Sequence, residues 1–361
     1  MQLGIIGLPN SGKTTVFNAL TGSNLETSGV SSGKLEVSTA VVNVPDPRVD
    51  LLSGIYEPKK TTYATITYND IGGLDKGISQ GGLSGPLRNA LAGADGFVHV
   101  VRVFEDEKVP HPYETVDAQR DVETIDGEFL LSDLITVEKR LERLAEELKK
   151  GGQNLDKRAN AVETELLTRV KNHLETEKPL RDLGLSQEEQ KALRGYGLLS
   201  IKPIVLVLNL GDEWQEPESL VSYDHQNAIL LGLQGQIEAE IAQLSDEDKE
   251  VFLDEYKITE PGSARVIRAS YSLMHTQTFF TVGPDEVRGW SVKIGATAPE
   301  AAGVIHSDLQ RGFIRAEVTP YEDFMALGGD MNEVKSKGKM RMEGKEYIVQ
   351  DGDILNIRFN V

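Results

Sequence analysis

The sequence predicts an α/β protein with a mostly parallel sheet, a helical insertion and a small, separate C-terminal domain. Three observations predict this organisation: apolar strands divided by helical spacers, a leucine-rich stretch at helical spacing near the middle, and short β-rich runs with turn signals near the end. The chain has 361 residues, which is too many for one small core and favours two or three domains.

Four segments have the character of strands in the main sheet. The first is residues 2–6, and a helix is expected to follow it from Gly12 to about Leu20. Residues 63–69 are rich in β-branched and aromatic side chains. Residues 97–103 and 204–208 are almost entirely apolar, as strands covered on both faces are. Helical spacers between such strands predict parallel pairing.

The insertion is predicted from two apolar stripes. The first steps by four and three residues through Leu130, Leu134, Val137, Leu141, Leu144 and Leu148. Gly151 and Gly152 interrupt it, and the second stripe contains Val162, Leu166, Val170 and Leu174. Stripes at heptad spacing are typical of packed helices, so an antiparallel helical hairpin is expected.

The C-terminal region changes pattern at about residue 278. Its predicted strands are residues 279–282, 313–318, 346–349 and 354–359. Asp351-Gly352-Asp353 is a turn signal between the last two strands. The pattern predicts a small α+β domain.

Composition excludes several classes of protein. The chain has no cysteine, which excludes disulfides and thiolate metal sites, and a cytoplasmic location is expected. It has no run of about 18–20 apolar residues, so no membrane association is expected. The formal net charge of −19 disfavours non-specific binding to nucleic acid. A local basic cluster could still meet RNA, and the candidates are Lys335, Lys337, Lys339, Arg341 and Lys345.

A phosphate-binding loop is predicted directly after the first strand. Residues 7–14 read Gly-Leu-Pro-Asn-Ser-Gly-Lys-Thr, the G-x-x-x-x-G-K-[ST] pattern. Backbone N–H groups of such a loop surround the phosphates, and Lys13 adds a positive charge. The Thr14 hydroxyl is the expected Mg²⁺ ligand. The nucleotide-binding residues expected here are Asn10, Ser11, Gly12, Lys13, Thr14 and Thr15.

Two further motifs follow predicted strands. Asp70-Ile71-Gly72-Gly73 comes after the strand at 63–69, where a carboxylate can reach Mg²⁺ and the Gly73 N–H can reach the γ-phosphate. Asn209-Leu210-Gly211-Asp212 follows the strand at 204–208, at the place where GTPases carry their base-reading N-K-x-D motif. Asn209, Leu210 and Asp212 are therefore candidates for contact with the base, and both ATP and GTP remain open as substrates.

These motifs resemble those of the YchF family, the Obg-like ATPases, within the translation-factor-class P-loop GTPases. The residues that carry the resemblance are 7–20, 44–48, 70–74, 99–102, 121–144 and several stretches from 278 to 353. The resemblance covers nearly the whole chain. It implies a P-loop G domain at 1–120 and 196–277, an inserted coiled-coil-like helical domain at 121–195, and a β-grasp TGS domain at 278–361.

The resemblance also implies a catalytic histidine. Many GTPases orient the attacking water with a Gln after D-x-x-G, but this chain has Leu74 there, which cannot hydrogen-bond to water. His111 matches a family histidine proposed for that role, although an exposed loop histidine is an equally good interpretation. His99, inside an apolar strand, is expected to be a hydrogen-bonded core residue, and His306 to be structural or on a contact surface.

Switch I departs from the family pattern. The position of the usual Thr falls on or near Lys34, and Ser31, Ser32 or Thr39 are alternatives.

The function expected from these features is slow, Mg²⁺-dependent hydrolysis of ATP or GTP by a regulatory switch. The resemblance implies a ribosome or RNA partner for the TGS domain, and a protein partner on the helical insert is also possible. The alternative is a nucleotide-sensing module that binds RNA or the ribosome and hydrolyses almost nothing.

Overall fold

The computed structural model describes residues 1–25, 37–72, 83–150, 156–255 and 260–360. The chain forms two compact units. One contains Met1–Ala40 and Thr67–Val266, and the other contains Val41–Ile66 and Ile267–Val361. Within the described ranges, every helix is too short or too polar to cross a membrane.

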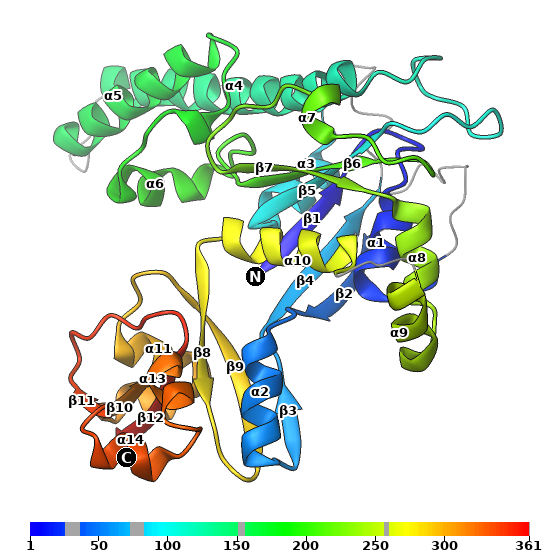
Figure 1. The fold of residues 1–361 in the computed structure, drawn as a ribbon. Helices are drawn as coiled ribbons and strands as arrows, with labels where there is room; N and C mark the ends of the chain where they lie inside the picture. Colours follow the sequence, from blue (N-terminus) through cyan, green and yellow to red (C-terminus); the bar gives the residue numbers. More distant parts are fainter. Residues whose placement is uncertain (26–36, 73–82, 151–155, 256–259, 361) are drawn as a thin grey trace. The chain divides into compact units, whose positions relative to one another are not determined.

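The first unit is organised around a six-stranded sheet in the order β2-β4-β1-β5-β6-β7 (Figure 1). Its strands are β1 (Gln2–Ile6), β2 (Val37–Asn43), β4 (Thr65–Ile71), β5 (Gly96–Arg102), β6 (Ile204–Asn209) and β7 (Ala228–Leu233). Strand β1 pairs in parallel with β4 and β5, and the pairs β5–β6 and β6–β7 are also parallel. The predicted parallel sheet is confirmed.

Strand register brings the ends of several strands together. Ile5 pairs with Asp70, and Ile6 pairs with His99. Asn209 lies between Arg102 and Leu233 in the neighbouring strands. The segments that follow β1, β4, β6 and β7 therefore leave the sheet at the same edge, which is where ligands bind in open parallel sheets.

Helices cover the faces of this sheet. On one face α3 (Gly85–Gly93) and the first part of α4 (Ala118–Lys150) pack on Ile6, Phe97 and Ile204. Strand β5 is buried along its full length, as its apolar sequence predicts. The remaining α-helices of this unit are α1 (Lys13–Thr21), α5 (Lys157–Leu174), α6 (Gln187–Leu193), α7 (Pro217–Leu220), α8 (Gly235–Ala242) and α9 (Asp246–Glu255). Helix α10 (Gly262–Leu273) is divided, because its residues up to Val266 belong to this unit and those from Ile267 belong to the second.

The predicted helical hairpin is formed by α4 and α5 (Figure 1). Its core contains Val137, Leu144, Leu167, Val170 and Leu174. Two residues of the predicted stripes do not belong to it, because Leu148 is 52% exposed and Val162 is 61% exposed. Leu167, which the second stripe omitted, is fully buried. The stripes locate the two helices correctly, but they do not identify which residues are buried near the helix ends.

Helix α4 begins at Ala118, before the start of the insertion predicted at residue 121. Its first turns bury Val122, Ile125 and Phe129 against the main sheet, and its later turns bury Val137 and Leu144 against α5. The same helix therefore belongs both to the core of the sheet and to the hairpin. Two 3₁₀ turns, η1 (Leu180–Asp182) and η2 (Arg194–Tyr196), follow α5.

The second unit has its own six-stranded sheet in the order β11-β10-β12-β8-β9-β3. The strands are β3 (Lys60–Thr62), β8 (Thr276–Thr281), β9 (Glu286–Lys293), β10 (Phe313–Pro320), β11 (Arg341–Glu343) and β12 (Asp353–Phe359). Its helices are α2 (Pro47–Tyr56), α11 (Ala298–Ile305), α12 (Ser307–Arg311), α13 (Tyr321–Ala326) and α14 (Met331–Ser336). The strand predicted at 346–349 is wrong, since only a single bridge joins Ile348 to Thr297, and the strand lies at 341–343 instead.

Residues 41–66 differ from the predicted division of the chain. They were assigned to the G domain, yet α2 and β3 form part of the second unit. Val49 and Leu52 of α2 are fully buried against Phe280 and Val287. Arg48 forms an ion pair with Asp351 at 2.7 Å. Apolar burial between segments so distant in sequence is not visible in local patterns.

Candidate nucleotide-binding site

The loop between β1 and α1 has the backbone geometry that a phosphate-binding loop needs. Gly7 has φ of 153° and Gly12 has φ of 89°, a region that side chains with a Cβ rarely adopt. A Cβ on Gly7 would lie 2.3 Å from the carbonyl oxygen of Val100, so no larger residue fits. Gly12 precedes α1, whose first N–H groups and dipole favour an anion at this end.

Lys13 folds back on this loop. Its Nζ donates to the carbonyl oxygens of Gly7, at 3.1 Å, and of Leu8, at 2.8 Å. The ammonium group is therefore held over the loop, where it can meet a phosphate with little rearrangement.

The two predicted metal ligands lie in contact. The Thr14 hydroxyl donates to Asp70 Oδ2 at 2.9 Å, although the two residues are far apart in sequence. Burial raises the pKa of Asp70, and this shift is opposed by the Thr14 hydrogen bond and the positive charge of Lys13. The other carboxylate oxygen, Oδ1, is buried and has no hydrogen-bond partner in the described part of the chain.

This pair fits a magnesium ion. Mg²⁺ prefers hard oxygen ligands and is usually held by one or two protein oxygens together with water and phosphate. Asp70 provides a carboxylate oxygen without a partner, and Thr14 provides a hydroxyl beside the phosphate loop. The described residues contain no cluster of three or more His, Cys, Asp or Glu, so no larger metal cage competes with this site.

The loop that contains His111 is tied to the phosphate loop. Asn10 Nδ2 donates to the carbonyl oxygen of Pro110 at 2.9 Å. The His111 side chain is only 3% exposed, and its Nε2 lies 2.8 Å from Asp121 Oδ2. The prediction of an exposed loop histidine is therefore wrong for the side chain, and His111 lies beside the loop expected to hold the nucleotide.

The hydrogen bonds of His111 determine its tautomer. Its Nδ1 accepts a hydrogen bond from the backbone N–H of Tyr113 at 3.1 Å. The proton must then be on Nε2, which donates to Asp121. Arg120 also donates to Asp121, at 2.8 Å. Because both ring nitrogens are engaged, the ring must turn before it can accept a proton from water.

Asn209 has a different role from the predicted contact with the base. Its side chain is buried and joins two backbone segments. Nδ2 donates to the Ser11 carbonyl oxygen at 3.0 Å, and Oδ1 accepts from the Gly235 N–H at 3.2 Å. Asn209 thus holds the phosphate loop to the start of α8, and its amide is not free to read a base in this conformation.

The other base-site candidates are divided between core and surface. Leu210 is buried, and its N–H donates to the carbonyl oxygen of Leu233. Asp212 is exposed, and its backbone carbonyl accepts from Gln234 Nε2 at 2.7 Å. Only Asp212 of the three keeps a side chain available to a ligand.

Several predicted residues lie outside the described part of the chain. They are Gly73, Leu74, Ser31, Ser32 and Lys34. Of the switch I candidates, Thr39 is among the described residues and lies in strand β2. Its hydroxyl donates a hydrogen bond to Asn69 Oδ1 at 2.8 Å. Thr15 lies in the first turn of α1, next to Thr14.

The other histidines follow the sequence predictions only in part. His99 is fully buried, so its prediction as a core residue is confirmed, but neither ring nitrogen has a hydrogen-bond partner among the described residues. Burial, together with the charges of Arg181 and Lys13, lowers the pKa of His99 to about 3. His306 is structural, because its Nδ1 accepts from the Asp308 N–H and caps α12.

One residue of the site was missed by sequence reasoning. Asp121 holds His111, and an acidic residue in the first turn of a long helix is too ordinary to be noticed. Gln234 belongs to the segment 234–236, which stands in the sequence where many GTPases have a base-contacting loop, and its side chain holds the backbone at Asp212.

Two family models match parts of this chain. Residues 2–136 match the family model described as "50S ribosome-binding GTPase", and residues 276–360 match YchF-GTPase_C, described as a protein of unknown function. The chain is 42% identical to the ribosome-binding ATPase YchF of Bacillus subtilis, with 100% of both chains covered. It is also 42% identical to the protein of the same name from Haemophilus influenzae, with 100% of this chain and 99% of the relative covered.

A solved structure extends the similarity to the whole fold. The YchF GTPase of Schizosaccharomyces pombe superposes with a TM-score of 0.84 at 30% identity. The match covers 99% of this chain and 97% of that one.

Proposed function

The chain belongs to the YchF family, and on that premise we propose that it is a ribosome-associated regulatory switch that slowly hydrolyses ATP or GTP with Mg²⁺. It is a P-loop nucleoside-triphosphatase linked to the ribosome, as its relatives and its GTPase domain indicate. The observation that carries the metal-dependent chemistry is the contact of Thr14 with Asp70 beside the phosphate loop.

Each residue of the loop has a role in this proposal. Backbone N–H groups from Asn10 to Thr15 surround the phosphates, and Lys13 moves from the loop carbonyls to the β- and γ-phosphates. Thr14 and Asp70 would hold Mg²⁺, and Gly73, which lies outside the described residues, is the proposed donor to the γ-phosphate. The metal, when bound, would neutralise charge that develops on the phosphate oxygens.

His111 is the proposed catalytic group. It accepts a proton from water, or orients the water, after its ring has left Asp121. The contact between Asn10 and the Pro110 carbonyl gives a route by which an occupied phosphate loop can shift the His111 loop. Slow turnover is expected because the ring is held in a conformation that cannot act as a base.

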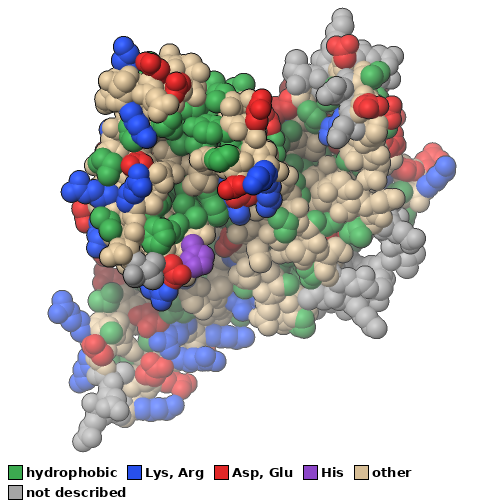
Figure 2. All heavy atoms as spheres, turned by 90° about the horizontal axis from the view of Figure 1, so that it is seen from below, with side chains coloured by type: hydrophobic (Ala, Val, Ile, Leu, Met, Phe, Trp, Pro, Cys, Tyr) green, Lys and Arg blue, Asp and Glu red, His purple; other side chains and the backbone are tan. Residues whose placement is uncertain are grey.

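The proposed partner is the ribosome, met through the C-terminal domain. We assign residues 278–361 to a TGS domain that contacts RNA, and residues 121–195 to a helical domain that contacts a protein. Residues 1–120 and 196–277 form the proposed G domain, although α2 and β3 pack with the C-terminal unit. Lys335, Lys337 and Lys345 are exposed on that unit. Figure 2 shows that basic and acidic side chains are interspersed over the face that it displays.

The function is tested at Lys13. Lys13→Ala should weaken Mg²⁺–nucleotide binding and lower turnover by about 100-fold or more, since both phosphate contact and charge are lost. The control variant is Lys59→Ala, which changes an exposed side chain of the second unit. Arg120→Lys would not be a suitable control, because Arg120 donates a hydrogen bond to Asp121. Unchanged affinity and turnover in Lys13→Ala would refute the proposal.

Base preference requires a separate experiment. The relatives are named ATPases, whereas an exposed carboxylate at Asp212 is suited to guanine. Affinities for ATP and GTP are measured by calorimetry in the wild type and in Asp212→Ala. Loss of GTP binding alone would assign guanine recognition to Asp212.

A second candidate function is a nucleotide sensor that hydrolyses almost nothing. The hydrogen bonds of His111 favour this function, because both ring nitrogens are engaged and the ring cannot accept a proton from water in this conformation. Single-turnover hydrolysis in the presence and absence of ribosomes separates the two. Release of phosphate that depends on His111 supports the switch, and none under either condition supports the sensor.

A further inference from the structure

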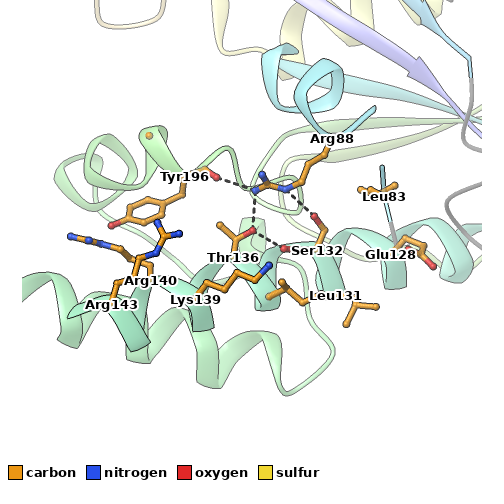
Figure 3. A pocket seen from close by; sticks show the side chains of 12 residues that line it. Leu83, Arg88, Glu128, Leu131, Ser132, Thr136, Lys139, Arg140, Arg143 and Tyr196 are labelled. Carbon is orange, nitrogen blue, oxygen red and sulfur yellow. Dashed lines mark hydrogen bonds between the residues drawn. The ribbon is translucent and has the colours of Figure 1, made fainter. Parts of the chain in front are cut away.

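A groove outside the phosphate loop lies where α3, α4 and η2 meet in the first unit (Figure 3). Its cavity volume is about 510 Å³, within the range of small-molecule sites. It shares no residue with the proposed nucleotide site. The groove is polar at one end, with Arg88, Lys139, Arg140 and Arg143 among the residues that line it.

Arg88 is held in place by neutral groups. Figure 3 shows its guanidinium reaching from α3 toward α4. It donates to Thr136 Oγ1 at 2.9 Å, to Ser132 Oγ at 3.3 Å and to the Tyr196 carbonyl oxygen at 3.3 Å. These contacts fix the geometry of the guanidinium. Burial raises the pKa of the nearby Asp133 to about 6, and the charge of Arg88 opposes that shift.

Lys139 and Arg143 are exposed and lie one helical turn apart on α4, so their Cβ atoms are about 5–6 Å from each other. Within the described part of the chain, Arg88, Lys139 and Arg143 form no ion pair. Arg140 is different, because Glu163 accepts from it at 2.7 Å. Three cations that form no salt bridge within the described part of the chain therefore line the groove.

The cluster lies in a chain that is acidic as a whole. The formal net charge is −19, and acidic residues outnumber basic ones by 57 to 38. The lining of the groove contains a single carboxylate, Glu128, whose pKa is raised by burial. Unpaired like charges repel one another, so an anion in the groove would relieve that repulsion.

The other end of the groove has two exposed apolar side chains near Glu128 (Figure 3). Leu131 is 46% exposed and Ile135 is 41% exposed, on the same side of α4 as Lys139. An anion bound by the three cations would have its remaining atoms over these two side chains. The arrangement suits a ligand with a charged group and a less polar body.

We propose that this groove is a second binding site, separate from the phosphate loop, that takes a phosphate-bearing ligand of about nucleotide size. Arg88 provides a planar guanidinium already oriented by Ser132 and Thr136, and Lys139 and Arg143 complete the positive charge. Guanidinium and ammonium groups both form strong, charge-assisted hydrogen bonds with phosphate oxygens. The phosphate can come from a free small molecule or from the backbone of a nucleic acid.

The test uses the methyl groups of two residues that line the groove as reporters of binding. The full-length chain is labelled with ¹³C in Ile and Leu methyl groups and titrated with inorganic pyrophosphate, and separately with a ten-nucleotide oligouridylate. The methyl signals of Ile135 and Leu131 should shift and saturate with at least one probe. The Lys139→Ala/Arg143→Ala double variant should weaken that binding by about tenfold or more.

A matched control separates the site from general charge. Lys149→Ala/Lys150→Ala removes two lysines from the exposed end of the same helix and should change the affinity by no more than about twofold. Saturation with pyrophosphate identifies free phosphate as the source, and saturation with oligouridylate alone identifies a nucleic-acid backbone.

Three results would overturn the proposal. The first is an absence of saturable shifts with both probes. The second is binding that is undiminished in the Lys139→Ala/Arg143→Ala variant while its methyl spectrum shows a folded protein. The third is equal affinity for a ten-residue polyglutamate peptide, which would make the groove a docking site for acidic protein segments.

Discussion

Asp70 and Thr14 are far apart in the chain but lie in contact. From this contact we predict that Asp70 is needed for binding Mg²⁺. Asp70→Asn keeps the size of the side chain but removes the charge that a divalent cation needs. Mg²⁺-dependent nucleotide affinity should fall by about 10- to 100-fold, while metal-independent binding changes little. Calorimetry with and without EDTA measures both quantities. Asp224→Asn, an exposed change in the same unit, is the control.

His111 makes a prediction about the chemical step. His111→Gln retains a donor to Asp121 but cannot accept a proton at neutral pH. We expect turnover to fall by about 100-fold or more with nucleotide affinity unchanged, because the base acts only in the transition state. Rapid-quench hydrolysis gives the rate. Equal rates in the two proteins would assign His111 to structure alone, and His306→Asn, which keeps a helix cap, controls for loss of a histidine.

His99 makes a prediction about pH. Its folded pKa of about 3 lies below the value of about 6.5 in an unfolded chain, so the unfolded state binds more protons between these values. The contribution of His99 to stability is therefore complete above pH 6.5 and is lost as pH falls toward 3. His99→Leu should reduce the slope of unfolding free energy against pH by up to about 1.4 kcal/mol per unit.

The measurement for His99 is urea unfolding between pH 4.5 and 7.5. Parallel curves for the wild type and His99→Leu would contradict the assignment of the buried, neutral ring. A general loss of stability at every pH would show only that leucine packs poorly there.

At the scale of elements, α4 carries the helical hairpin and also part of the sheet's core. Leu144 and Leu148 are one turn apart and were predicted on the same seam, yet the first is buried and the second is 52% exposed. Leu144→Ala should therefore cost about 2–5 kcal/mol of unfolding free energy. Leu148→Ala should change it by no more than about 0.5 kcal/mol.

Urea unfolding followed by circular dichroism compares these two variants under the same conditions. Equal losses would mean that the hairpin core extends to the end of α4. The comparison is matched, because both changes remove the same atoms from the same helix.

At the scale of the whole molecule, charge is distributed unevenly. Of the net charge of −19, the second unit contributes only −2, and the first unit contributes the remaining −17. A nearly neutral unit with exposed lysines approaches an anionic partner more easily than a strongly acidic one does. This distribution supports contact with RNA through the C-terminal domain.

Lys337→Glu/Lys345→Glu tests that contact. Association with ribosomes, measured by cosedimentation at about 0.1 M salt, should weaken by about tenfold or more, and nucleotide affinity should not change. Lys59→Glu/Lys60→Glu makes the same change of charge elsewhere in the second unit. Equal loss in both variants would point to net charge rather than to a binding surface.

Local sequence was sufficient for much of the fold. The strands β1, β5 and β6, the helix α1 and the α4–α5 hairpin were predicted close to their observed bounds, because apolar periodicity and glycine are local signals. The strand at 346–349 failed because Ile348 makes only a bridge, so a short β-rich run was not enough to build a ladder.

The sequence by itself determined that this protein has a phosphate loop. Gly7, Gly12, Lys13 and Thr14 are adjacent in the chain, and their backbone requirements are set by φ values that only a few residues tolerate. It also indicated the parallel sheet and the hairpin.

Only the tertiary structure decided what the distant residues do. It joined Thr14 to Asp70, His111 to Asp121, and Asn209 to both Ser11 and Gly235. It also brought α2 into the second unit and placed Arg88, Lys139 and Arg143 along one groove. The physical reason is that strand register and apolar burial bring together segments separated by tens to hundreds of residues, which no local pattern in the sequence encodes.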